Sequence, residues 1–245
     1  MILDIDVGNS SVKWILRGGA DNSPAPRGRV AHGELDRWLG QFGDQQLTSI
    51  RLCSVVGSAT EVILAWAQRT GTPVGVATVQ DGAGGVRCGY RDPSRLGVDR
   101  WLAMVAARQA CSQTMAVVDA GTALTVDIVD AAGQHLGGYI VPGLGLMAKS
   151  LGDHTWGVRA PSSGGESVEP GRATAEAVGH GCLLATLGLV ESLVERQALR
   201  ALFITGGDGA CLVRHLRLNN AMRAVEIVFA PSLVLDGLAV ALPLS

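Results

Sequence analysis

Two segments of the chain carry the same chemical pattern, an apolar run that ends in Asp-x-Gly followed by a small polar residue. They are ILDIDVGNS at 2–10 and MAVVDAGTA at 115–123. A glycine in such a turn can adopt positive φ and expose backbone N–H groups, and the neighbouring hydroxyl adds a further donor. Donors suited to phosphate therefore adjoin a carboxylate suited to a cation, Asp6 in one copy and Asp119 in the other. The pattern predicts a nucleotide–metal site to which two similar halves contribute.

The composition is that of a compact α/β enzyme. Apolar residues make up 47% of the 245 residues and charged residues 17%, with 33 glycines, unlike disordered or fibrous chains. The length suits one large domain or two of about 120 residues, and the repeated pattern favours two similar halves. A net charge of −2 without a Lys/Arg run supplies no electrostatic footprint for nucleic acid or an anionic membrane. We therefore expect small-molecule partners.

The cysteines and histidines argue against disulfides and transition-metal sites. Five widely spaced cysteines without a CxxC pair fit neither a disulfide framework nor a zinc site, so we expect reduced thiols and a cytoplasmic protein. The histidines lack metal-binding spacing, so any metal is expected to be a hard cation held by carboxylates. Acidic residues interrupt the apolar N-terminus, and Pro and Asp interrupt the apolar stretch 227–244; neither a signal peptide nor a membrane span is predicted.

The elements that must position these carboxylates follow from hydrophobic periodicity and turn residues. In the first half we expect strands within 1–17 on both sides of a turn at 7–10, strands at 27–34, 49–56 and 73–79, helices at 34–42, 58–70 and 100–111, and a glycine-rich loop at 82–92. In the second half we expect strands at 115–119, 123–129 and 134–140, a helix after Pro142 and Gly143, a long loop at 152–172, a helix at 173–197, the strand ALFIT at 201–205, a helix at 208–217, a strand at 224–229 and a helix from Ser232. The order strand, strand, strand, helix occurs in both halves.

Five motifs identify a family. They are DVGNSSVK at 6–13, GYRDPSRLGVDR at 89–100, VVDAGTALTVD at 117–127, LGGYIVPGLGLMAKSL at 136–151, and the segment 171–179 around Thr174. On these motifs the chain resembles the type III pantothenate kinases, in the superfamily of acetate kinase, sugar kinases, Hsp70 and actin. D-x-G-N alone is common in turns, but five motifs in the family's order over most of residues 1–180 are specific.

The resemblance implies an α/β fold of duplicated ribonuclease H-like (actin-like ATPase) domains, each a mixed sheet flanked by helices, with the domains at 1–112 and 113–245. It implies ATP-dependent phosphorylation of pantothenate to 4′-phosphopantothenate, the first step of coenzyme A biosynthesis. It also implies a homodimer that needs Mg²⁺ and a monovalent cation, K⁺ or NH₄⁺.

The resemblance further assigns the ATP site and the cations. The ATP-binding residues would be Asp6, Val7, Gly8, Asn9, Ser10, Ser11, Val12, Lys13 and Thr122. Asp6 would also bind Mg²⁺ through ATP, and Asp119 would bind the monovalent cation. From the residues alone, Asp6 could equally be a turn aspartate, and the segment 8–13 could be a plain hairpin with an exposed Lys13.

For the acceptor, the resemblance assigns Asp99 as the base that receives the hydroxyl proton of pantothenate. The substrate-binding residues would be Tyr90, Gly97, Val98, Asp99, Arg100 and Thr174. The resemblance implies that the partner subunit of the dimer contributes Thr174. Ordinary structural alternatives stay open: helix capping for Asp99 and Thr174, a surface position for Arg100, and a half-buried structural role for Tyr90. Gly206 and Gly207 could pack against adenosine or form a simple strand-to-helix turn.

Two segments depart from the family's pattern. Ser10 stands where the family usually has Thr, which preserves the hydroxyl, and HTWGVRAP at 154–161 replaces a Thr-Ala-x-Leu-Pro stretch. Asp127 belongs to a motif, but its role is not assigned. Two other functions remain open because fold does not fix function: a regulatory or accessory protein on the same fold, or a kinase of another small alcohol with a changed pocket around Tyr90 and Thr174.

Overall fold

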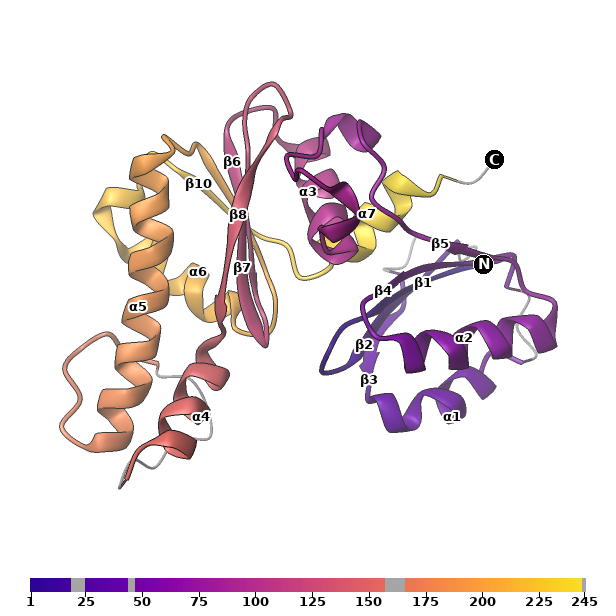
Figure 1. The fold of residues 1–245 in the computed structure, drawn as a ribbon, viewed down its shortest axis with the longest axis horizontal. Helices are drawn as coiled ribbons and strands as arrows, with labels where there is room; N and C mark the ends of the chain where they lie inside the picture. Colours follow the sequence, from indigo (N-terminus) through magenta and orange to yellow (C-terminus); the bar gives the residue numbers. More distant parts are fainter. Residues whose placement is uncertain (19–24, 44–46, 157–165, 244–245) are drawn as a thin grey trace. The chain divides into compact units, whose positions relative to one another are not determined.

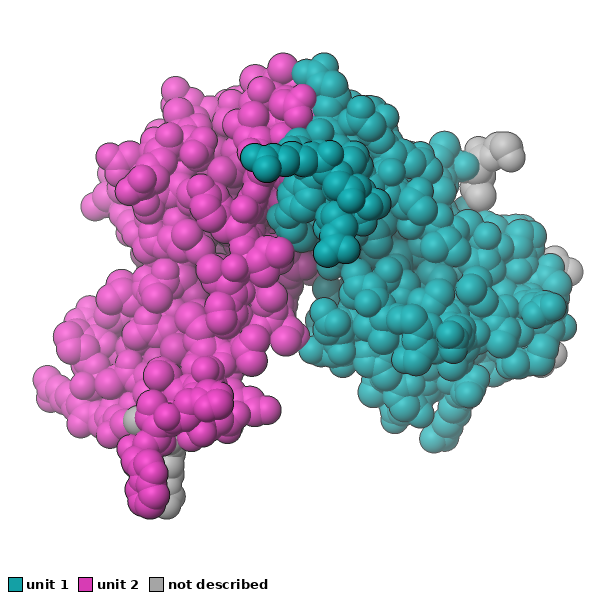
Figure 2. Space-filling view, viewed as in Figure 1, with its two compact units in different colours: residues 1–110, 232–245 teal, residues 111–231 magenta. Residues whose placement is uncertain are grey.

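The chain folds into two compact units. The computed structural model describes residues 1–18, 25–43, 47–156 and 166–243. Unit 1 comprises residues 1–110 and 232–245, and unit 2 comprises residues 111–231, as coloured in Figure 2. The division falls close to the boundary expected between 112 and 113. The C-terminal segment, expected with the second half, belongs by its contacts to unit 1.

Unit 1 is built on a five-stranded mixed sheet (Figure 1). Its strands are β1 (Ile2–Val7), β2 (Val12–Arg17), β3 (Arg27–Val30), β4 (Ser49–Ser54) and β5 (Val74–Val76), in the order β3-β2-β1-β4-β5. β1 pairs antiparallel with β2 and parallel with β4. The central strand β1 is therefore flanked on both sides, and its carboxyl end opens into the turn at residues 8–11.

The two faces of this sheet differ because β1 alternates apolar and acidic residues. Leu3, Ile5 and Val7 are buried in a core with helices α1 (Leu35–Gly40) and α2 (Gly57–Thr70). Asp4 and Asp6 point to the opposite face, since successive side chains of a strand alternate. The sheet thus has one hydrophobic face, packed against the helices, and one face that carries the carboxylates of Asp4 and Asp6.

Helices α3 (Val98–Ala110) and α7 (Leu233–Ala241) contact each other and the sheet of unit 1; they lie together in Figure 1. A Cβ on Gly237 would lie 2.1 Å from the carbonyl oxygen of Leu102, so the two helices touch backbone to backbone at a position where only glycine fits. The C-terminal helix is therefore a support for α3.

Unit 2 repeats the same topology. Its strands are β6 (Met115–Ala120), β7 (Ala123–Val129), β8 (His135–Pro142), β9 (Ala201–Thr205) and β10 (Glu226–Phe229), in the order β10-β9-β6-β7-β8. β6 pairs antiparallel with β7 and parallel with β9, as β1 pairs with β2 and β4. Its helices are α4 (Leu144–His154), α5 (Thr174–Arg196) and α6 (Gly209–Leu218). The repeated mixed sheet with flanking helices is the predicted fold class.

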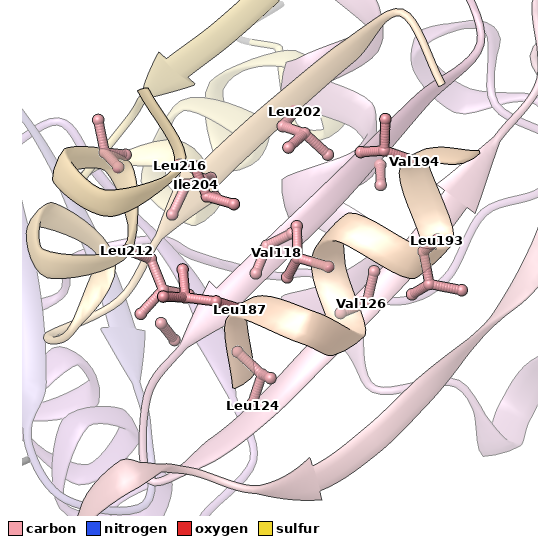
Figure 3. Close-up of a cluster of buried hydrophobic side chains, with 14 of the residues drawn as sticks. Val118, Leu124, Val126, Leu187, Leu193, Val194, Leu202, Ile204, Leu212 and Leu216 are labelled. Carbon is pink, nitrogen blue, oxygen red and sulfur yellow. The ribbon is translucent and has the colours of Figure 1, made fainter. Parts of the chain in front are cut away.

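The core of unit 2 joins one face of its sheet to α5 and α6. Figure 3 labels Val118, Leu124, Val126, Leu202 and Ile204 from the sheet, and Leu187, Leu193, Val194, Leu212 and Leu216 from the helices. Among the described residues, α5 is the one helix with the length and hydropathy of a membrane span. Its buried leucines belong to this core, so the helix serves as a core helix of unit 2.

Several element boundaries differ from those expected. The helix expected at 34–42 is a short turn η1 (His32–Glu34) followed by α1, the helix expected from 100 begins at Val98, and the strand expected at 73–79 is shortened to β5. Single 3₁₀ turns also occur at η2 (Ala83–Gly85), η3 (Pro93–Arg95) and η4 (Asn220–Met222). Of the segment 154–161, residues 157–161 lie outside the described part of the chain.

One expectation about backbone conformation is wrong. Neither Gly8 nor Gly121 is among the glycines with positive φ, whereas Gly206 has a φ of +91°. The turn after β1 closes instead by a hydrogen bond from Gly8 N–H to the carbonyl of Ser11 at 3.2 Å. The polar turns are as expected in position, but the glycines of unit 2 with positive φ, Gly133, Gly137 and Gly206, lie outside the turn at Gly121.

Candidate active site

The candidate site of unit 1 starts at the carboxyl end of β1. Asp6 pairs in register with Lys13 on β2 and with Cys53 on β4. Residues in register on neighbouring strands point to the same face, so a carboxylate lies between an amine and a thiol. Asp6 is 5% exposed, and burying a carboxylate is costly unless donors or cations compensate it.

Helix α3 brings a second carboxylate to this place. Burial raises the pKa of the Cys53 thiol well above its usual value, and the charges of Asp6 and then Asp99 raise it further, while Lys13 opposes them. Cys53 is also hydrogen-bonded to Asp6. The charges of Asp6 on β1 and Asp99 on α3 therefore act on the same buried thiol.

The turn between β1 and β2 is exposed at its tip. Asn9 and Ser10 are exposed, and Gly8 and Ser11 are half-buried. The Nε2 of His32 lies 2.9 Å from the carbonyl oxygen of Gly8. The expected phosphate loop is therefore an ordered, hydrogen-bonded turn with accessible donors.

The start of α3 is shaped around Asp99. The helix begins at Val98, so Asp99 lies in its first turn and is not the N-cap, the structural alternative considered for it. Asp99 Oδ1 accepts the backbone N–H of Arg100 at 2.8 Å. A Cβ on Gly97 would lie 2.6 Å from that same oxygen, so the absence of a side chain at 97 makes room for the carboxylate.

Arg100 and Tyr90 form a pair beside this helix start. Arg100 is 8% exposed, which removes the helix-surface alternative. Its Nη1 donates to the hydroxyl of Tyr90 at 2.8 Å, and its guanidinium carbon lies 5.6 Å from the centre of the tyrosine ring. Such stacking and hydrogen bonding fix a planar donor group. The segment 90–100 thus places a carboxylate, a guanidinium and a phenol together.

The corresponding place in unit 2 is the end of β6, where several backbones converge on Asp119. Asp208 N–H donates to the carbonyl of Ala120, and Gly143 N–H donates to the carbonyl of Thr122, both at 3.0 Å. A Cβ on Gly206 would lie 2.5 Å from Oδ1 of Asp119. Gly206 therefore allows close backbone approach to the carboxylate, a role that the sequence did not indicate.

Asp208 is a second carboxylate in this region that sequence reasoning missed. It precedes α6, and burial raises the pKa of its carboxyl group above the usual value. The backbone of Asp208 is tied to Ala120, one residue beyond Asp119. No sequence signal identified it, because a D-G pair is typical of an ordinary turn.

Thr174 is the first residue of α5. Its predecessor Ala173 is the N-cap, so the capping alternative for Thr174 is not realised. Thr174 lines a hollow of ≈ 590 Å³ between α4, α5 and the end of β8, together with Pro142, Met147, Ser150, Leu151, Ala177, Val178, Gly181, Cys182 and Ala185. The hollow is mainly apolar, with Thr174 and Ser150 supplying hydroxyls.

Asp127, the motif residue without an assigned role, has a structural partner. His135 Nε2 lies 3.0 Å from Asp127 Oδ1, and both side chains are almost fully buried. The pair joins β7 and β8 at a bulge in their register near Val129. Its interior position is that of a structural polar pair.

The donor set fits a hard cation. The described residues contain no group of three His, Cys, Asp or Glu that could enclose a metal ion. Mg²⁺ in phosphoryl-transfer sites is bound by one or two carboxylates together with substrate phosphates, a requirement that Asp6 beside an accessible turn can meet. A dedicated transition-metal centre is not present in the described part of the chain.

Comparisons with known proteins give the family. The sequence profile of the type III pantothenate kinases matches residues 2–196. Type III pantothenate kinases of Ectopseudomonas mendocina and Pseudomonas aeruginosa are 40% and 39% identical to the chain, each over the full length of both proteins.

Solved structures agree in fold. A Sinorhizobium meliloti protein assigned as a 2-dehydro-3-deoxygalactonokinase matches with a TM-score of 0.62 and 15% identity over 100% of this chain and 98% of the other. A Campylobacter jejuni protein assigned to the Baf family of transcriptional activators matches with a TM-score of 0.57 and 20% identity over 96% and 94%. At these identities the likeness concerns the fold. From the profile match and the full-length relatives, the chain belongs to the type III pantothenate kinase family.

Proposed function

We infer that the protein phosphorylates pantothenate with ATP to give 4′-phosphopantothenate, the first step of coenzyme A biosynthesis, with Asp99 as the proton acceptor. The activity follows from family membership. The observation that supports the catalytic assignment is that the charges of Asp6 and Asp99 both raise the pKa of the buried Cys53 thiol. A carboxylate suited to the nucleotide's cation and a carboxylate suited to the acceptor hydroxyl would then serve one transfer.

On the nucleotide side, the turn after β1 supplies the phosphate contacts. Its backbone N–H groups and the hydroxyls of Ser10 and Ser11 are donors for phosphate oxygens, and Lys13 adds a positive charge beside Asp6. Val7 and Val12 pair at the base of the turn and set the position of Gly8 and Asn9. Mg²⁺ bound to ATP would neutralise phosphate charge, with Asp6 as its protein carboxylate.

On the acceptor side, phosphoryl transfer needs positioning and a base within hydrogen-bond reach of the hydroxyl. Asp99 would accept the proton as the oxygen of pantothenate bonds to the γ-phosphorus and the bond to ADP breaks. Arg100, held by Tyr90, would bind the carboxylate or hydroxyls of pantothenate through its planar donors. The backbone at Gly97 and Val98 would supply further contacts.

On the side of unit 2, we assign Asp119 to a monovalent cation, K⁺ or NH₄⁺, and Thr122 to ATP. The convergence of backbone from Gly206 and Asp208 on the end of β6 supports a rigid carboxylate at Asp119. Activity measured at equal ionic strength in K⁺, NH₄⁺ and Na⁺ tests this assignment. Equal rates in all three salts would remove the selective cation.

The functional form would be a homodimer in the cytoplasm. Unit 2 exposes large apolar side chains on β8, α4 and α5, namely Leu136, Tyr139, Ile140, Leu146, Leu151 and Leu184. Exposed apolar surface of this kind favours a protein partner, and a second copy is the simplest one. Thr174 on α5 could then serve the acceptor site of a partner subunit. Light scattering of the purified protein tests the dimer.

The experiment that tests the function is a coupled ADP-release assay with ATP, Mg²⁺, K⁺ and a panel of small alcohols including pantothenate. Turnover restricted to pantothenate is expected. Turnover with a different alcohol would identify a kinase of changed specificity. Inactivity with every alcohol would favour the regulatory alternative.

A further inference from the structure

His32 contacts the phosphate turn from outside every motif of the family. It is the first residue of η1, which follows β3, and β3 ends opposite the start of β2 through the pair Val12 and Val30. This register brings residue 32 beside the turn at 8–11. Since the carbonyl of Gly8 can only accept, the 2.9 Å contact requires that His32 Nε2 donates.

The rest of the ring agrees with this tautomer. His32 Nδ1 is buried and has no hydrogen-bond partner among the residues that the structure describes. A buried donor without an acceptor costs more than a buried acceptor without a donor. The hydrogen therefore resides on Nε2, and the ring acts as a fixed donor toward the turn.

We propose that His32 is a positioning residue for ATP: by holding the carbonyl of Gly8, it fixes the Gly8–Asn9 peptide so that the Asn9 N–H is presented to a phosphate oxygen. In a planar trans peptide the C=O and N–H bonds point in opposite directions. Anchoring the carbonyl on the His32 ring thus turns the Asn9 N–H away from that ring. Asn9 is an exposed residue, so a ligand can approach this part of the turn.

The alternative orientation of this peptide would remove the donor. The other end of the turn is already held, because Gly8 N–H donates to Ser11 at 3.2 Å. The direction of the Gly8–Asn9 peptide therefore depends on the hydrogen bond from the His32 side chain. This inference rests on the proposed role of the turn in ATP binding and goes beyond it, since His32 would act without touching the nucleotide.

The test compares His32→Phe with His32→Gln. Phenylalanine fills the space of the ring without a donor, whereas the Nε2 of glutamine can replace the donor of histidine. We expect His32→Phe to raise the KM for ATP about three- to tenfold, the worth of one hydrogen bond, with kcat and the KM for pantothenate little changed. His32→Gln is expected to restore the ATP KM. Glu34→Ala, on the same turn and exposed, is the matched control and should leave all constants unchanged.

Ser10→Ala distinguishes a failure of the role proposed for His32 from a failure of ATP binding by the turn at 8–11. If Ser10→Ala raises the KM for ATP while His32→Phe leaves it unchanged, His32 does not position the turn. The same conclusion follows if His32→Phe and His32→Gln have the same KM for ATP. If both Ser10→Ala and His32→Phe leave the KM for ATP unchanged, the turn does not bind ATP, and the proposed ATP-binding role of the turn is wrong. Should His32→Phe not fold in a thermal melt, His32→Ala gives the same comparison with His32→Gln.

Discussion

A Cβ atom on Gly97 would stand 2.6 Å from Oδ1 of Asp99. The carboxylate thus occupies the space that any other residue at position 97 would need. The backbone is anchored there too, because Trp101 N–H donates to the carbonyl of Gly97 at 3.0 Å. The glycine is required for the placement of a neighbouring side chain and not for an unusual φ.

Gly97→Ala should therefore lower kcat with little loss of stability. The new methyl group would push the Asp99 carboxylate out of line with the acceptor hydroxyl, and a displacement of about 1 Å can cost roughly 100-fold in rate. Steady-state kinetics and a thermal melt of the variant check this. Gly40→Ala is the matched control, since a Cβ there meets nothing within 4 Å. An unchanged kcat for Gly97→Ala would separate Asp99 from catalysis or show that its rotamer is unimportant.

Asp99→Asn should abolish most turnover while the protein stays folded. Loss of a general base typically costs about 10²- to 10⁴-fold in rate. The hydrogen bond from Arg100 N–H to Oδ1 can be retained by the amide oxygen of asparagine, so the melting temperature should hold. Near-normal kcat in a folded Asp99→Asn protein would exclude Asp99 as the base.

Cys53 should be inert in the native protein. Burial, with the charges of Asp6 and Asp99, raises the pKa of its thiol, so almost no thiolate is available at neutral pH. Iodoacetamide is expected to label Cys88 and Cys211, which are half-exposed, and to reach Cys53 only after unfolding. Peptide mass spectrometry with and without urea reads out each site. Native labelling of Cys53 at the rate of Cys88 would contradict the burial and the raised pKa of this thiol.

The fold was largely predictable because its signals are local. Alternation within β1 separates Leu3 and Ile5 from Asp4 and Asp6, and the same strand-turn-strand pattern recurs at Asp119. These periodicities depend on neighbours a few residues apart. They therefore predict the repeated sheet plan, and the family motifs add the roles proposed for the site.

The remaining features depend on contacts between distant segments. The hydrogen bond of His32 to Gly8 needs the pairing of β2 with β3, and Cys53 reaches Asp6 only through the register of β1 with β4. The packing of Gly237 against Leu102 joins the end of the chain to α3. Tertiary pairing of this kind leaves no periodic trace in one sequence, which is why the C-terminal helix was expected with the second half.

Asp208 should give unit 2 a pH-dependent stability of defined sign. Burial raises the pKa of its carboxyl group, so the folded state holds this proton more tightly than the unfolded state. Its contribution is therefore most favourable at low pH, and it is lost as pH rises from about 4 through the raised value. Asp208→Asn should flatten the unfolding free energy over that range and be at least as stable at pH 7, measured by urea unfolding. Asp153 is exposed, so Asp153→Asn should keep the wild-type dependence of unfolding free energy on pH. If Asp208→Asn also kept the wild-type dependence, a raised pKa of the Asp208 carboxyl group would be excluded.

Asp4 and Asp6 lie two residues apart on one face of β1. Substitution of Asp4 should mainly lower stability, and substitution of Asp6 should mainly lower activity. Asp4 is fully buried and accepts hydrogen bonds from Arg51 Nε at 2.6 Å, Arg51 Nη2 at 2.9 Å and Arg17 Nε at 2.5 Å. The same arginines donate to the carbonyls of Leu235 and Leu242, so the cluster also fastens the C-terminal segment to the sheet. Asp4→Asn leaves a buried guanidinium without its countercharge and should lower the free energy of unfolding by about 3 kcal/mol.

Asp6→Asn should do the reverse. It removes the carboxylate beside the turn at 8–11, for which we propose phosphate binding, so we expect a large loss in kcat/KM for ATP with a smaller change in unfolding free energy. Kinetics below the melting range and urea unfolding of both variants give the comparison. If the folded Asp4→Asn enzyme lost as much activity as Asp6→Asn, the expected division of roles would be wrong. The arginines that pair with Asp4 would then be needed for the chemistry at Asp6.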